Sequence, residues 1–101
     1  MTLDDLRQQI DDIDERIVVM LNERAGCALR IGELKDALGL AIYQPDRERA
    51  VLAHVRGINR GPLTDDAIVR LFERIIDEAR RLEREAKERE GHRAARPDAN
   101  D

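Results

Sequence analysis

Five charged side chains stand in or beside apolar helical stripes of this 101-residue chain: Arg7, Arg24, Lys35, Glu48 and Glu83. A charge beside an apolar stripe usually belongs to a long side chain whose end reaches water, and this remains the alternative for four of them. Arg24 is the exception, because it occupies a central position of its stripe, where burying a charge is costly. There the choice lies between a device that fixes helix register and a ligand contact.

The spacing of the three cations predicts the kind of ligand. Arg24 and Lys35 would lie about 16 Å apart on one face of a helix, so their long side chains could grip one small molecule. Arg7 lies about 42 Å from Lys35 along the same helix, too far for that. An antiparallel partner helix would bring Arg7 of one chain to Lys35 of the other, so a site using all three would be shared between two chains. Three inward cations favour a small dianion, and arginine gives bidentate contacts to carboxylates.

The apolar positions from Leu3 to Leu38 recur at alternating steps of three and four, without a proline. This pattern predicts one very long first helix, with Thr2 as its N-cap and Gly39 as its C-terminal stop. Such a helix would be roughly 54 Å long, whereas a compact domain of this size is roughly 26 Å across. The stripe therefore needs a partner along its whole length, and we expect a homodimer with paired first helices.

Two further helices are expected after a loop. The second begins at Pro45 and has Glu48 on its apolar face, and the third is capped by Thr64 and has Glu83 at the edge of its stripe. From residue 80 the third helix becomes rich in charged residues and is expected to be solvated. The final eleven residues, GHRAARPDAND, predict a disordered tail over 91–101, after a single helical domain over 1–90.

Composition supports an all-α fold with three helices per chain. Charged residues make up 40% of the chain and aromatic residues 2%, which favours helices with solvated faces over a β-sandwich or barrel. The formal net charge of −4 provides no basic field for nucleic acid. Neither a signal-peptide core nor a membrane-spanning run is present, so a cytoplasmic protein without membrane contact is expected. Cys27 lies in the first apolar stripe and is predicted to be a small buried side chain.

Several chemistries lack the residues they require. The sequence has no glycine-rich phosphate loop and no Cys/His cluster with metal-ligand spacing. It also has no pair of nucleophile and base. We therefore expect no metal site, and any catalysis should rest on positioning and electrostatics.

Three segments, LRQQIDDIDERIVVMLNERAGCALRIGELK, YQPDRERAVL and IVRLFERIIDEARRLE, resemble the all-helical chorismate mutases of the shikimate pathway. The resemblance extends from Leu3 to about Glu83, and the segments occur in the order that the family has. It implies an intertwined homodimer of three-helix chains. It also implies an isomerase that rearranges chorismate to prephenate, the branch step toward phenylalanine and tyrosine, without a cofactor.

The resemblance implies roles for the cations and for Glu83. Arg24, together with Arg7 of the other chain, would bind the two carboxylates of chorismate. Lys35 would donate to the ether oxygen whose bond breaks and would also contact a carboxylate. Glu83 would stand on the other side of that oxygen, where many members of the family have Gln.

The remaining implied site residues are at the start of the second helix and in the third. Glu48 would accept from the ring hydroxyl of the substrate, and Arg47 would support the site beside it. Gln44 stands where some members have Asp, which matters little if the contact there is made by the backbone. Ala79 stands where some have Ser, so one hydroxyl donor to the ring carboxylate is missing.

Other functions remain open at this point. Isochorismate pyruvate-lyase is a related activity on the same fold, although Glu48 and the PDRE segment that contains it favour the mutase. A non-catalytic helical dimerisation module is the alternative from another class. It predicts that Arg24 and Lys35 can become Met or Leu with a gain of stability. An accessory role that docks to another shikimate-pathway enzyme is the third alternative.

Overall fold

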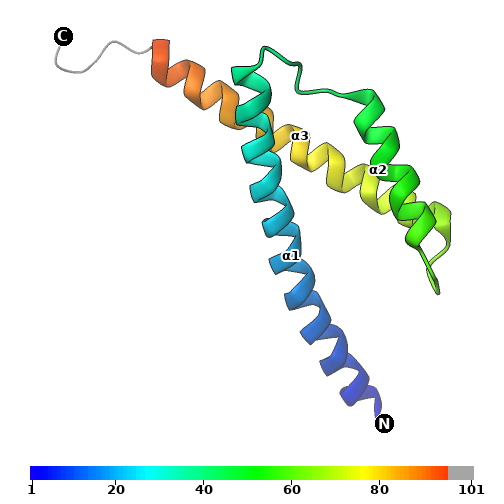
Figure 1. Ribbon diagram of the computed structural model, residues 1–101. Helices are drawn as coiled ribbons and strands as arrows, with labels where there is room; N and C mark the ends of the chain where they lie inside the picture. The colour runs from blue at the N-terminus through cyan, green and yellow to red at the C-terminus, as the bar shows by residue number, and fades with distance from the viewer. Residues whose placement is uncertain (96–101) are drawn as a thin grey trace.

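The computed structural model describes residues 1–95, which form three helices and no strand (Figure 1). They are α1 (Leu3–Ala37), α2 (Pro45–Ile58) and α3 (Asp65–Ala95). The predicted all-α fold with a very long first helix is confirmed, since α1 contains 35 residues. None of the described helices combines the length and apolar character needed to cross a membrane.

Local signals determine both ends of α1. At the start, Thr2 Oγ1 accepts a hydrogen bond from the Asp5 amide at 3.1 Å, and the Thr2 amide donates to Asp5 Oδ2 at 3.0 Å. The hydrogen bond from the Thr2 amide lowers the pKa of the Asp5 carboxyl below its ordinary value. At the end, Gly39 has φ +72°, and the Leu40 amide donates to the Lys35 carbonyl oxygen at 2.7 Å. This Schellman-type ending anchors the last turn of α1, which contains Lys35.

The N-terminus of α3 is capped as the sequence predicts. Thr64 Oγ1 accepts from the Ala67 amide at 3.1 Å. At its other end α3 continues through Ala95, beyond the boundary that was predicted after Glu90. A glycine within a helix costs only about 1 kcal/mol, and the Glu, Arg and Ala residues around Gly91 are good helix formers, which explains the longer helix. The rest of the predicted tail, 96–101, lies outside the described residues.

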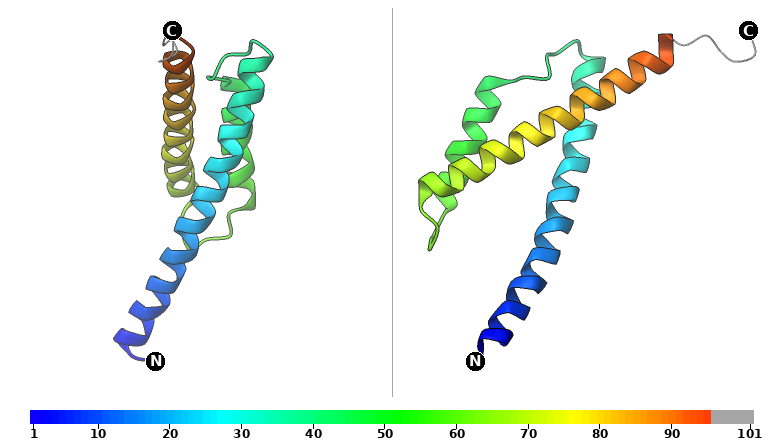
Figure 2. Two further views of the ribbon diagram at one scale, coloured as in Figure 1. Left: turned by 90° about the vertical axis from the view of Figure 1, so that its left-hand side faces the viewer. Right: turned by 180° about the vertical axis from the view of Figure 1, so that it is seen from behind.

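The helices form two layers, with α3 in one layer and α1 and α2 in the other (Figure 2). Helix α3 packs against both α1 and α2, which lie on the same side of it (Figure 2). The N-terminal part of α1 extends away from the other two helices (Figures 1 and 2). The radius of gyration of 18.4 Å therefore exceeds the roughly 13 Å of a compact 100-residue domain.

A single chain buries very little apolar surface. Within the described part, Val55 and Ile76 are the only hydrophobic residues that are buried, and each is still 7% exposed. The stripe along α1 is largely exposed to solvent, including Leu3, Leu6, Ile10, Ile13, Ile17, Met20, Ile31 and Leu34. An exposed apolar surface of this length marks a site of association with another surface.

Candidate active site

An open cavity of about 280 Å³ lies between the second half of α1, the start of α2 and the middle of α3. Seven of the eight predicted site residues line it: Arg24, Lys35, Gln44, Arg47, Glu48, Ala79 and Glu83. Arg7 is exposed on the projecting part of α1 and does not line the cavity. The fold thus brings together side chains that are up to 59 positions apart in the sequence.

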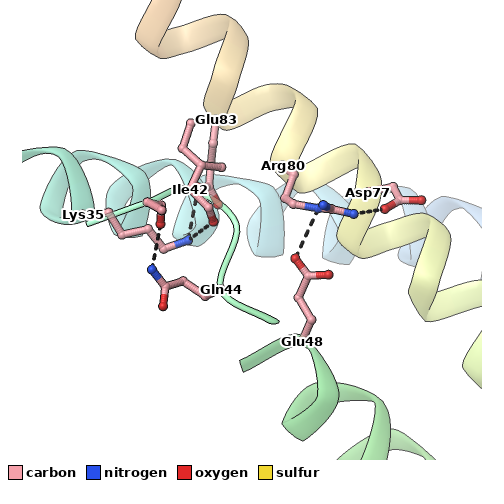
Figure 3. Close-up of polar contacts among 8 residues, drawn as sticks. Lys35, Ile42, Gln44, Glu48, Asp77, Arg80 and Glu83 are labelled. Atoms are coloured by element: carbon pink, nitrogen blue, oxygen red, sulfur yellow. Dashed lines mark hydrogen bonds and ion pairs between the residues drawn. The ribbon is translucent and has the colours of Figure 1, made fainter. Parts of the chain in front are cut away.

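Lys35 and Glu83 form an ion pair across the contact between α1 and α3. Lys35 Nζ is 3.4 Å from Glu83 Oε2 and donates to the Ile42 carbonyl oxygen at 3.0 Å (Figure 3). Only 8% of Glu83 is exposed, and it is the only charged residue in the described range that is buried. Two fixed acceptors on different elements therefore hold the ammonium group of Lys35 at the cavity wall.

A glycine allows Glu83 to lie against α1. A Cβ atom added to Gly32 would be 3.1 Å from Glu83 Cγ and 3.5 Å from Glu83 Oε2. The 3.1 Å contact is tighter than ordinary packing, so the Glu83 side chain would have to shift by a few tenths of an ångström to admit an alanine there. The sequence interpretation did not single out Gly32, although a glycine three residues before Lys35 inside a long helix was a possible signal.

The loop before α2 is also held close to the cavity. Gln44 Nε2 donates to the Ala41 carbonyl oxygen at 2.8 Å, so its amide stabilises the loop and does not cap α2. Arg24 is half-buried in the cavity wall. Ala79 contributes a methyl group where a serine would contribute a hydroxyl.

Arg80 is a cavity residue that the sequence interpretation missed. It was assigned to the solvated part of α3, but it lines the cavity, and its Nε is 3.2 Å from Glu48 Oε2. Its guanidinium group also lies 5.0 Å from the centre of the Tyr43 ring. Its spacing was the available signal, because it follows the buried Ile76 by four positions and precedes Glu83 by three.

Cys27 differs from its predicted state. It is exposed and lines the cavity, because none of the described residues covers that side of α1. Among the charged residues around the cavity, four are cations and two are carboxylates, so the excess charge is positive. This balance suits an anionic ligand. No group of three or more His, Cys, Asp or Glu placed to hold a metal ion occurs within the described residues.

The three helices surround a cavity whose excess positive charge suits a small anionic ligand. Comparison with known proteins identifies the family of the chain. The chain belongs to the chorismate mutase type II family, whose model matches residues 6–84. A bifunctional chorismate mutase/prephenate dehydratase of Neisseria gonorrhoeae is 45% identical over 87 residues, which cover 82% of this chain and 24% of that protein. The chorismate mutase of Methanocaldococcus jannaschii is 29% identical over 84 residues, which cover 82% of this chain and 85% of that protein.

A solved structure extends the likeness to the fold. The chorismate mutase of Thermus thermophilus (form II) superposes with a TM-score of 0.80 at 35% identity, covering 81% of this chain and 93% of that one. The chain spans only about a quarter of the length of the bifunctional relatives that it matches.

Proposed function

We propose that this chain is a chorismate mutase, which rearranges chorismate to prephenate on the route to phenylalanine and tyrosine. One observation supports this function most strongly. A member of the chorismate mutase type II family places seven of its eight predicted site residues around one cavity with excess positive charge. Chorismate is a dianion, and such a cavity attracts it.

The reaction needs geometry and charge stabilisation. The rearrangement is pericyclic, so no proton has to be transferred, and negative charge gathers on the ether oxygen as its bond to carbon breaks. Lys35 donates to this oxygen from the cavity wall, where a fixed positive group stabilises the transition state more than the substrate. Arg24, with Arg7 of a second copy, holds the two carboxylates and restricts chorismate to its reactive conformer.

The site is shared between two copies of the chain in a homodimer. The exposed stripe of α1 supports this, because a second α1 in antiparallel orientation covers it along its length. Arg7 supports it as well, since it lies about 42 Å from Lys35 along the helix and reaches a site only on another copy. A closed dimer of this kind has two equivalent sites.

The proposed function is tested with the purified protein and two substrates. Prephenate should form from chorismate, and release of pyruvate from isochorismate should be much slower. Faster pyruvate release would favour the lyase on the same fold. Activity on neither substrate would contradict the proposed function and leave a dimerisation module.

We expect a hydrogen-bond donor in place of Glu83 to raise the activity. An ether oxygen only accepts hydrogen bonds, and an ionised carboxylate also only accepts, so a carboxylate at position 83 offers that oxygen no hydrogen bond. The amide of a glutamine donates at any pH. Glu83→Gln should therefore improve the activity at pH 8.

The measurement is kcat/KM for the wild type and Glu83→Gln at pH 8. Glu85→Gln serves as the control, because Glu85 lies two residues further along α3 and is exposed. Its activity should match that of the wild type. If the wild type and Glu83→Gln had the same activity, the side chain at position 83 would have no part in the mechanism and Lys35 would be the only donor to the ether oxygen.

A further inference from the structure

We propose that Arg80 is a positioning residue that holds Glu48 in place to accept a hydrogen bond from the ring hydroxyl of the substrate. The inference rests on the proposed function, in which Glu48 makes that contact. It adds a residue of α3 to the recognition of the hydroxyl. It also gives a role to a mostly buried side chain in the charged segment of α3 that is predicted from its composition to be solvated.

The first support is the contact between Arg80 and Glu48 across the cavity. Arg80 Nε, on α3, is 3.2 Å from Glu48 Oε2, on α2, and the two side chains are 27% and 23% exposed (Figure 3). The Nε–H group is buried and has no aligned hydrogen-bond acceptor within the described residues, so the contact is an ion pair without a hydrogen bond. Coulomb attraction depends on distance, and it is less screened between side chains that are mostly buried.

The second support is that Arg80 is itself held on two other sides. Its guanidinium group forms an ion pair with Asp77 one turn earlier on α3. The Tyr43 ring, from the loop before α2, lies 5.0 Å from it, within the range of a cation–π contact. An arginine constrained by α3 and by this loop presents its charge to Glu48 at a fixed place, whereas a free arginine would not.

The third support is electrostatic. Glu48 is a carboxylate in a cavity that is proposed to bind a dianion, so the substrate repels it. Unless a cation offsets this repulsion, Glu48 would turn away from the substrate. Arg80 offsets it from the side of α3, so that Arg24 and Lys35 remain available for the substrate carboxylates and the ether oxygen.

The inference predicts that Arg80 and Glu48 act as one unit. Arg80→Met should lower kcat/KM for chorismate roughly tenfold to a hundredfold, the range for a coupled charged pair at a site. In a Glu48→Gln background the same change should have an effect of less than about threefold, because the carboxylate to be held is gone. Arg80→Lys keeps the charge and should recover part of the loss. If Arg80→Met folds poorly, Arg80→Lys is compared with the wild type in its place.

Arg81→Met is the matched control. Arg81 is the next residue of α3, but 63% of its side chain is exposed, and it faces Glu78 outside the cavity at 3.9 Å. This variant should keep the activity of the wild type. Melting temperatures and dimer mass, measured on every variant, separate a positioning effect from a loss of structure.

The outcomes distinguish the inference from the proposed function. A full-sized effect of Arg80→Met in the Glu48→Gln background would overturn the inference, because Arg80 would then act independently of Glu48. So would an Arg80→Met variant that is as active as the wild type. A wild-type protein without mutase activity would overturn the proposed function, and this inference with it.

Discussion

Replacing Lys35 by methionine is expected to lower kcat for chorismate by about a hundredfold to a thousandfold, the usual loss when one fixed donor to a developing negative charge is removed. Lys35 is held at the cavity wall by the Ile42 carbonyl oxygen at 3.0 Å and by Glu83 Oε2 at 3.4 Å. Methionine has a similar length and no charge, so it leaves the cavity filled but unable to stabilise the ether oxygen. The measurement is kcat and KM at a pH where the wild type is most active.

Stability and activity should respond differently to this change. Lys35→Met leaves the buried Glu83 carboxylate without its cation, which is expected to cost about 1–3 kcal/mol of stability. The double variant Lys35→Met/Glu83→Gln removes the unpaired carboxylate and should recover stability without recovering activity. Recovery of both would mean that Lys35 serves the fold and not the reaction.

Lys87 provides a matched control for Lys35. Its Nζ is also 3.4 Å from a carboxylate oxygen across the contact between α1 and α3, that of Asp36. The Lys87–Asp36 pair is more than half exposed, and a pair of this kind contributes little to stability. Lys87→Met should therefore leave both kcat and the melting temperature nearly unchanged. An equal loss in Lys35→Met and Lys87→Met would contradict the assignment of Lys35 to the site.

The helices could be predicted from the sequence because their signals are local. Thr2 with Asp5, Gly39 and Thr64 each determine a helix end through hydrogen bonds or a backbone conformation within a few residues. The apolar steps of three and four predicted the long α1 in the same way. The length of α3 was underestimated, because the charged and glycine-containing segment before Ala95 has no apolar stripe to mark it as helical.

The parts that the sequence did not reveal depend on how the helices cross. Gly32 matters only because α3 crosses α1 where Glu83 lies, and Arg80 matters only because α2 brings Glu48 to it. Neither crossing point can be derived from periodicity. Cys27 was predicted to be buried because it lies in the apolar stripe that predicted α1. The stripe does not show whether the surface that packs against it belongs to the same chain or to a second one.

Arg7→Ala and Lys35→Ala are each expected to be nearly inactive alone and to regain activity when they are mixed. Each proposed site takes Lys35 from one chain and Arg7 from the other, so either homodimer has the same lesion in both of its sites. A heterodimer has one site with both lesions and one site with neither. Its activity should therefore reach up to about half that of a wild-type dimer.

The mixing experiment tests the shared site most directly. Equal amounts of the two variants are mixed, subunit exchange is verified with a tagged copy, and light scattering checks that the mass is twice the 11.6 kDa of the chain. A shared site predicts that mutase activity appears as heterodimers form and rises in proportion to their amount. Heterodimers that form in full and stay as inactive as the two separate variants would show that each site lies within one chain.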